Sequence, residues 1–374
     1  MSATLPRTRA SLQVGFDSGW HVGVQLAVWR DGEPLLTLAQ GVARPGVAMT
    51  DDSLIAWFSG TKLVTATAVV QLWDRGLLDL DQTVASVIPE FSAHGKEAVT
   101  IAHLLTHTGG FRRLGGTGNM FVGGIEPEAL SQAIYESPLE DGWVPGARAG
   151  YHPVTGFHVL GEIVRRVDGR SFEAYVSEEI FERLGMADSW VTMPPERVRA
   201  YGDRIVTMHD TAVSPPRILP RFLKDTGFGW VEPSGSAVGP MTDLVRLAEA
   251  LRRSGELGGE RILSPQAVSA MTRRVRAGMR DETFGAVMDW GLGAMVNSWH
   301  YAHQATPYGY GDHAGRDAFG HGGRQCCLVF ADPEHGLSVA FAANGMPGEA
   351  NNQRRTQPVI TALYEDLGLA PVTS

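Results

Sequence analysis

Cysteine is nearly absent from this 374-residue chain, and long apolar segments are missing altogether. The two cysteines, Cys326 and Cys327, are adjacent, so no disulfide framework can be built from them. No apolar run reaches the roughly 18 residues that a transmembrane helix needs, and the N-terminus leads into no signal-peptide pattern. The sequence therefore predicts a cytoplasmic protein with reduced thiols and no membrane partner.

Basic residues, and lysines in particular, are also few. Lysine and arginine together number 32 against 41 acidic residues, and the resulting net charge of −9 disfavours binding to nucleic acid or to an anionic membrane. Only three of the basic residues are lysines: Lys62, Lys96 and Lys224. Arginine cannot lose its proton in a protein whereas lysine can, so a lysine in such an arginine-rich chain is worth examining as a base.

The chain does contain enough apolar material for a large core. Hydrophobic residues make up 43% of it, and its length fits one large domain or two that share an interface. The apolar periodicity predicts strands at both ends of the chain and helices between them. The expected strands cover residues 22–30, 34–40, 290–297, 324–331 and 336–343, and the expected helices 59–75, 100–106, 127–136, 154–167, 171–184, 242–253 and 355–367.

Turn and loop signals divide these elements. Asp31-Gly32 is typical of a two-residue hairpin turn, and Thr242 is expected to cap the helix over 242–253. The glycine-rich residues 108–124 and the proline-rich residues 192–222 are predicted loops. Strands at both ends around a helical middle indicate an α/β (α+β) protein, in which an inserted helical domain (81–224) interrupts a sheet domain (1–80 and 225–374).

The first candidate for chemistry is a serine followed by a lysine. Ser59 stands at the predicted start of a helix, and Lys62 follows one turn later on the same face. At that spacing the lysine amine can take the proton of the serine hydroxyl, and the helix N-terminus supplies positive potential for a developing oxyanion. The alternative is a serine that only caps the helix, followed by a solvated lysine.

Two further candidates lie downstream. Tyr151 follows the turn signal Pro145-Gly146, where a phenol can relay a proton if a nearby cation lowers its pKa; alternatively, its ring only packs. The segment 319–323, Phe-Gly-His-Gly-Gly, lets a ligand lie along the backbone and leaves the N–H of Arg324 to face it. Ordinary turn chemistry is the alternative for this segment.

Twelve histidines raise the question of a metal site. The closest cluster, His300, His303 and His313, lacks the His-Glu-x-x-His spacing of a catalytic zinc site, and we predict neither a metal nor a cofactor. We interpret Cys326 and Cys327 as small apolar strand residues rather than as metal ligands or a redox pair.

At these separations the motifs resemble those of the serine β-lactamase and penicillin-binding-protein superfamily. The resemblance is to its class C-like branch, which includes the family VIII carboxylesterases and related acyltransferases. It rests on Ser59-x-x-Lys62, on Tyr151, on His321-Gly322-Gly323 and on landmarks along nearly the whole chain. These landmarks are residues 22–41, 103–110, 145–153, 160–166, 239–244, 263–265 and 319–333.

The resemblance implies a fold and a set of roles. The fold is β-lactamase-like, an antiparallel sheet flanked by helices plus the helical insertion, with the active site in the cleft between them. Ser59 is then the nucleophile, Lys62 the base that acts when neutral, and Tyr151 its proton-shuttling partner. The backbone N–H groups of Ser59 and Arg324 form the oxyanion hole. Once Lys62 has taken a proton, its charge is expected to favour an ionised Tyr151.

Departures from the family pattern bear on the substrate. Tyr151-His152-Pro153 stands where β-lactamases have Tyr-x-Asn, and His321-Gly322-Gly323 stands where they have Lys-Thr-Gly. Without the asparagine amide and the lysine of these motifs, the substrate is expected to be an ester rather than a β-lactam. His152 and residues 321–323 are the expected substrate-binding residues. Gln325-Cys326-Cys327 replaces the glycine and serine of related esterases, and is expected either to narrow the cleft or to point into the core.

We therefore expect a serine acyl-transfer enzyme that works through an acyl-Ser59 intermediate, a carboxylesterase for small or medium esters. The alternative is a transacylase that passes an acyl group from an ester or thioester to an alcohol or amine, in the biosynthesis of specialised metabolites. A β-lactamase or peptidase and a catalytically silent binding protein are the remaining alternatives. The expected partners are a small-molecule acyl donor and, for a transacylase, a small-molecule acceptor.

Overall fold

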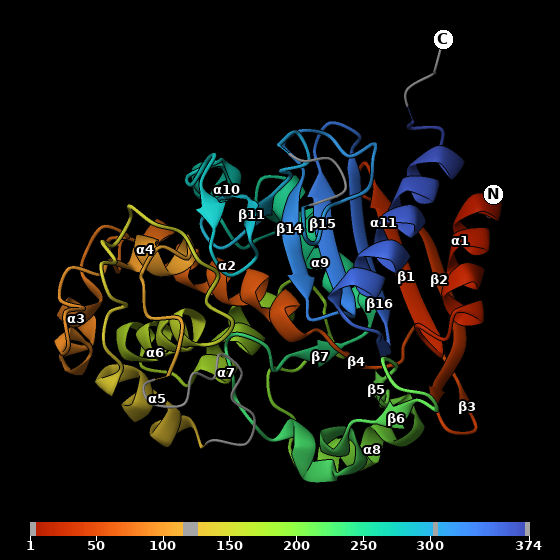
Figure 1. The fold of residues 1–374 in the computed structure, drawn as a ribbon, viewed down its shortest axis with the longest axis horizontal. Helices are drawn as coiled ribbons and strands as arrows, with labels where there is room; N and C mark the ends of the chain where they lie inside the picture. Colours follow the sequence, from red (N-terminus) through yellow and green to blue (C-terminus); the bar gives the residue numbers. More distant parts are fainter. Residues whose placement is uncertain (1–4, 115–125, 302–305, 371–374) are drawn as a thin grey trace.

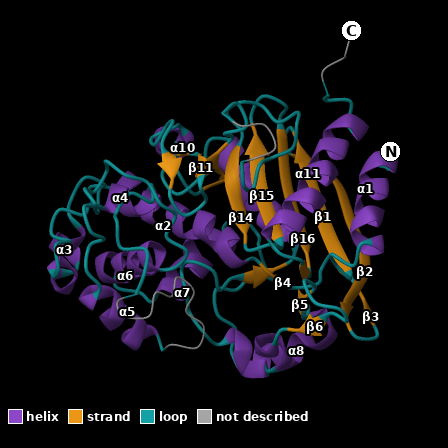
Figure 2. Ribbon diagram, in the orientation of Figure 1, coloured by secondary structure: helices purple, strands orange, loops and turns teal. Residues whose placement is uncertain are grey.

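An eight-stranded antiparallel sheet lies at the centre of the fold (Figures 1 and 2). The computed structural model describes residues 5–114, 126–301 and 306–370. Strands from both ends of the chain meet in the order β12-β13-β14-β15-β16-β1-β2-β3. Their bounds are β1 Gly23–Arg30, β2 Glu33–Arg44, β3 Val47–Ala48, β12 Asp289–Trp290, β13 Met295–Val296, β14 Phe319–Gly323, β15 Cys327–Asp332 and β16 Leu337–Ala343.

The N-terminal hairpin confirms the predicted turn. Asp31 and Gly32 have φ values of 52° and 95°, the positive angles that a two-residue turn between β1 and β2 requires. Strand β1 also pairs antiparallel with β16 from Val24 to Arg30, which places the first strand of the chain beside one of the last. The sheet therefore forms only when the two ends of the chain come together.

Helices cover both faces of this sheet. On one face, α1 (Pro6–Asp17) packs against α11 (Glu349–Asp366), and both share an apolar cluster with Val24, Leu26 and Val28. On the other face, α9 (Met241–Arg252) contacts β1, β15 and β16. Because successive strand side chains point to opposite faces, burial on both sides explains why the central strands are apolar almost throughout.

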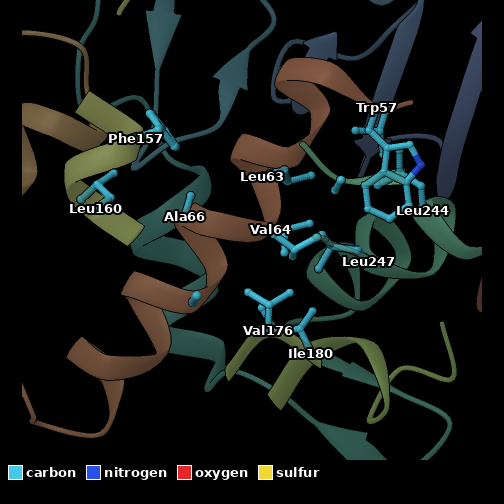
Figure 3. Packing of buried hydrophobic residues seen from close by; sticks show 14 of the residues in the cluster. Trp57, Leu63, Val64, Ala66, Phe157, Leu160, Val176, Ile180, Leu244 and Leu247 are labelled. Atoms are coloured by element: carbon cyan, nitrogen blue, oxygen red, sulfur yellow. The ribbon is translucent and has the colours of Figure 1, made fainter. Parts of the chain in front are cut away.

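Helix α2 (Thr61–Asp74) lies between the sheet and the remaining helices and is buried from Thr61 to Leu72. Figure 3 shows its residues Leu63, Val64 and Ala66 packed among side chains of α6, α9 and the segment that follows α7. Neighbours on all sides hold this helix in place. The residues at its N-terminus, including Ser59 and Lys62, are therefore fixed by the core.

The other helices gather mainly beside α2, on the side away from the sheet (Figure 1). They are α3 Val84–Val87, α4 Ile101–Leu105, α5 Pro127–Glu136, α6 Thr155–Asp168, α7 Phe172–Val176, α8 Pro195–Tyr201 and α10 Pro265–Thr272. The short strands outside the main sheet are β4 Ile55–Ala56, β5 His209–Asp210, β6 Arg217–Ile218, β7 Val238–Gly239, β8 Glu256–Leu257, β9 Glu260–Arg261, β10 Arg280–Asp281, β11 Ala286–Val287 and β17 Gly345–Met346. None of the helices in the described segments is long and apolar enough to cross a membrane.

The glycine-rich segment 319–323 differs most from its prediction, because it is strand β14 rather than a lead-in to a strand. Its glycines are required by crowding: a Cβ at Gly320 would collide with the carbonyl oxygen of Val329, and one at Gly323 with that of Trp57. Glycine has a low strand propensity, so the sequence did not predict this strand, which contacts with neighbouring segments stabilise.

Smaller differences concern the ends of elements. The predicted strand 290–297 is two short strands, β12 and β13, and helix α11 begins at Glu349 rather than near 355. Helix α1 was not expected from the sequence. Pro240 rather than Thr242 occupies the N-cap of α9, and the Thr242 hydroxyl donates to the carbonyl of Asp51. Part of the predicted loop 108–124, from residue 115 on, lies outside the described residues.

Candidate active site

Ser59 sits in a strained turn just before α2. The 3-10 turn Phe58–Gly60 leads directly into the helix, and Phe58 has a φ of 45°, which is unusual for a residue with a side chain. The turn is anchored because Gly60 N–H donates to the Trp57 carbonyl at 2.9 Å, while Trp57 Nε1 donates to the carbonyl of Gly239. Ser59 lies in the first turn, where backbone N–H groups precede the helical hydrogen-bond ladder.

Lys62 is fully buried behind Ser59, and three oxygen atoms surround its amine. Nζ lies 2.7 Å from the carbonyl oxygen of Pro153, 2.8 Å from that of Ser234 and 3.1 Å from Ser59 Oγ. A neutral amine has two N–H bonds and one lone pair. The two carbonyls accept the two N–H bonds, so the lone pair is left to accept the hydroxyl proton of Ser59. This geometry is that of a general base.

The electrostatics of the site agree with this geometry. Burial lowers the pKa of Lys62 to about 7, while the negative charge of Glu232 raises it and partly opposes the burial. The solvated-lysine alternative is therefore wrong. At neutral pH a substantial fraction of Lys62 is in the basic form that proton abstraction needs.

Tyr151 completes the group around the serine. The centroid of the Tyr151 ring lies 5.1 Å from the Lys62 amine, and the Tyr151 hydroxyl is hydrogen-bonded to Ser59. Burial raises the pKa of Tyr151 well above its ordinary value, and the bond to Ser59 only partly opposes the rise. With Lys62 neutral, the Tyr151 hydroxyl therefore keeps its proton and can both donate and accept a hydrogen bond. That a protonated Lys62 favours an ionised Tyr151 stays a prediction.

Asp281 holds Tyr151 in place, and sequence reasoning missed it. Its Oδ1 accepts the Tyr151 N–H at 3.0 Å, while its Oδ2 lies 3.1 Å from Arg276 Nη2 in a fully buried ion pair. The Thr283 hydroxyl donates to the carbonyl of Tyr151 at 2.9 Å. These residues lie 125 to 132 positions away from Tyr151 along the chain, so nothing in the local pattern around either segment signals the contact.

Strand β14 supplies the opposite wall. Ser59, Tyr151, His321, Gly322 and Arg324 line one cavity of about 480 Å³, so the structure brings these predicted residues together. A Cβ at position 322 would collide with the ring of Tyr308, another residue of this cavity. Glycine at position 322 is therefore a steric requirement of the wall.

His321 is a neutral hydrogen-bond acceptor in this wall. Its Nδ1 lies 2.7 Å from the carbonyl oxygen of Gly322, and a carbonyl only accepts, so Nδ1 carries the proton. Burial, together with the charge of Lys62, lowers the pKa of the ring to about 3. Nε2 therefore has a lone pair, and it has no partner among the described residues.

His152 is not brought to the cleft with the other predicted substrate-binding residues. Its side chain is fully buried, and its Nε2 accepts the N–H of Phe111 at 3.3 Å. The side chain packs against the rings of His107 and Phe111, because the residue after Tyr151 faces the helices rather than the cavity. Gly323 likewise packs against the Trp57 backbone behind the site.

The cysteines lie beneath the catalytic turn. Cys326 and Cys327 are 2% and 4% exposed, and a Cβ at Gly60 would lie 3.3 Å from the sulfur of Cys327. Burial raises the pKa of both thiols, so neither is a ready nucleophile. Among the described residues no group of three potential ligands could hold a metal ion, and His303 of the predicted histidine cluster lies outside those residues.

Comparison with known proteins decides the family. The β-lactamase family model matches residues 9–363, nearly the whole chain. This chain belongs to the β-lactamase family. The predicted superfamily and fold are thereby confirmed, and the chain is an enzyme of the serine hydrolase and acyltransferase type found in this family.

Named relatives include esterases alongside penicillin-binding proteins. Esterase EstB of Burkholderia gladioli is 32% identical over 371 residues, covering 87% of this chain and 88% of that protein. Esterase/beta-lactamase LipL of Mycobacterium tuberculosis is 27% identical over 352 residues, covering 86% and 77%. The crystal structure of a family VIII carboxylesterase superposes with a TM-score of 0.75 at 28% identity and covers 96% of each chain.

Proposed function

We propose that the protein is a carboxylesterase that hydrolyses esters of small or medium size through an acyl-Ser59 intermediate. The observation that carries the proposal is the surroundings of Lys62. Two backbone carbonyls occupy the N–H bonds of the neutral amine, so its lone pair faces the Ser59 hydroxyl at 3.1 Å. The similarity to EstB and to a family VIII carboxylesterase supports an ester as the substrate.

The reaction proceeds in two transfers. Lys62 accepts the Ser59 proton while Oγ forms a bond to the carbonyl carbon of the ester, and the N–H groups of Ser59 and Arg324 receive the developing oxyanion. The C–O bond to the alcohol then breaks. The alcohol leaves with the proton, which the neutral Tyr151 hydroxyl passes on from Lys62. Water repeats the sequence on the acyl-enzyme and releases the acid.

Two features of the cavity favour esters over β-lactams. Position 153 is a proline, whose backbone carbonyl binds Lys62 and whose side chain has no amide to offer. The wall residue His321 is neutral, so it supplies no positive charge for a lactam carboxylate. A volume of about 480 Å³ suits small or medium acyl and alcohol groups.

A transacylase is the second candidate, and the position of Glu349 favours it. This exposed carboxylate lines the same cavity, and its Oε2 accepts a hydrogen bond from the Tyr308 hydroxyl at 2.9 Å. A carboxylate at the entrance attracts a cationic amine, which could then replace water in the second transfer.

Ester turnover with and without an amine tests both candidates. p-Nitrophenyl esters of increasing acyl length are given to the wild type and to Ser59→Ala, and intact mass spectrometry followed by peptide mapping locates the acyl group. We expect turnover and an adduct on Ser59 in the wild type only. No adduct on Ser59 of the wild type, either from these esters or from a fluorophosphonate, would instead support a silent binding protein. If added amines take up the acyl group in competition with water, the transacylase becomes the better description.

A further inference from the structure

A second serine, Ser131, lies in a separate cavity with a histidine and a carboxylate behind it. Ser131 Oγ is 2.8 Å from His158 Nε2, and His158 Nδ1 is 3.0 Å from Glu232 Oε2. The three residues come from α5, from α6 and from the segment before β7; the two helices lie beside each other (Figure 1). Ser131 is half-buried, whereas His158 and Glu232 are 5% and 2% exposed.

The polarity of these contacts is that of a nucleophile with its base and an orienting acid. A carboxylate only accepts hydrogen bonds, so the tautomer of the imidazole that fits this contact has its proton on Nδ1. Its Nε2 then has a lone pair to accept the Ser131 hydroxyl. Glu232 is itself fixed, because its Oε1 accepts the N–H of Ser234 at 3.0 Å.

The cavity at Ser131 can admit a ligand. It has a volume of about 610 Å³ and is separate from the Ser59 cavity, with walls from α5, α6 and the residues around 171–173 and 231–233. Beyond Ser131 and His158, three glutamates and two arginines line it: Glu128, Glu162, Glu173, Arg165 and Arg166. This slight negative excess favours uncharged or cationic ligands over anionic ones.

We propose that Ser131, His158 and Glu232 form a second nucleophilic site, at which small, uncharged activated esters acylate Ser131 independently of Ser59. The Oγ–C bond forms as His158 Nε2 takes the hydroxyl proton. The bond to the leaving phenolate breaks with its electron pair, and the phenolate receives that proton from the imidazolium. Glu232 keeps the Nδ1 proton throughout. Ser131 lies in the second turn of α5, where its own N–H is engaged in the helix and cannot stabilise an oxyanion. Both acylation of Ser131 and hydrolysis of the acyl group are therefore slow.

Labelling of enzyme that lacks the first nucleophile tests the proposal. Ser59→Ala protein is incubated with p-nitrophenyl acetate or a fluorophosphonate, and intact mass followed by peptide mapping locates the adduct. We expect one adduct on Ser131, absent in Ser59→Ala/Ser131→Ala. In the Ser59→Ala background, His158→Gln should slow its formation roughly 10²-fold. Ser171→Ala is the matched control, since Ser171 borders the same cavity but serves as the cap of α7.

The outcome separates this site from the one at Ser59. A Ser59→Ala protein that stays unlabelled would overturn the proposal, and so would an adduct that persists in the double variant. Labelling that His158→Gln leaves unchanged would overturn the assigned base. None of these results bears on whether Ser59 itself carries an acyl group in the wild type.

Discussion

Ser59 and Ser131 each have a candidate base within hydrogen-bond distance, yet their surroundings differ. At Ser59 the proposed base is a lysine whose pKa burial lowers to about 7, and the serine stands before a helix, where backbone N–H groups are available. At Ser131 the proposed base is a histidine oriented by a carboxylate, and the serine stands inside a helix. A base makes a serine hydroxyl reactive. The position of the serine relative to the helix decides whether backbone N–H groups can stabilise the oxyanion.

Glu232 connects the two regions. Its Oε2 faces His158, and its Oε1 accepts the N–H of Ser234, whose carbonyl accepts from Lys62. The same carboxylate therefore orients one base directly and acts on the other by charge and through one residue of backbone. Substitutions around Ser59 and around Ser131 test how far the reactions of the two serines are independent.

The largest effect is expected from Lys62→Arg, which keeps a positive charge but removes a group that can be neutral. We expect kcat/KM for p-nitrophenyl esters to fall about 10³-fold, because arginine cannot act as a base at neutral pH. Lys224→Arg is the matched control, since Lys224 is exposed and should tolerate the change. Retention of most activity in Lys62→Arg would show that Lys62 is not the general base. Acylation of Ser131 in the Ser59→Ala background should be unaffected.

Tyr151→Phe should reduce the rate roughly 10²-fold if the hydroxyl relays the proton to the leaving alcohol. Since burial raises the pKa of Tyr151, activity should also show no decline as the pH passes about 10, where a free tyrosine ionises. Steady-state rates across that pH range measure both effects. Tyr301→Phe, at a position 42% exposed, controls for the loss of a hydroxyl. An unchanged rate in Tyr151→Phe would show that the phenol takes no part.

A smaller effect is expected from His321→Gln. The unpartnered Nε2 can accept one hydrogen bond from the substrate, and one such bond is worth about 1 kcal/mol, or roughly fivefold in kcat/KM. The loss should appear for esters whose alcohol part carries a hydroxyl and should be absent for those without a donor. Equal losses for both substrates would indicate that His321 only shapes the wall.

Local sequence patterns predict much of the fold and only the centre of the site. The Asp31-Gly32 hairpin and the one-turn spacing of Ser59 and Lys62 are encoded over a few residues, so both could be predicted from local sequence. Strand β14 was missed because its glycines are required by contacts with other segments. The Val329 carbonyl, for example, leaves no room for a side chain at Gly320.

Contacts between distant segments explain the remaining gaps. Asp281 and Glu232 act on Tyr151 and Lys62 only after folding, across more than a hundred residues. The substrate-binding role expected for His152 rested on its position beside Tyr151, but its side chain packs against His107 and Phe111. The domain boundaries and the cytoplasmic location stay predictions.

The smallest change in maximal rate, and the sharpest test of the link between the two serines, is expected from Glu232→Gln. Hydrolysis needs neutral Lys62, so kcat/KM rises with pH through the pKa of Lys62, about 7 in the wild type. The charge of Glu232 raises that pKa against burial. Its removal should therefore lower the pKa and move the rise in activity to lower pH, with little change in the plateau at high pH.

A merely structural role for Glu232 would lower the plateau and leave the midpoint in place, so the pH profile distinguishes the two roles. Glu173→Gln removes a carboxylate from the wall of the Ser131 cavity and should move neither the midpoint nor the plateau. In the Ser59→Ala background, Glu232→Gln should also slow the acylation of Ser131, because the amide carries no negative charge and its single oxygen cannot accept from both His158 Nδ1 and the Ser234 N–H. A shifted midpoint with unchanged Ser131 labelling would show that the carboxylate serves Lys62 alone.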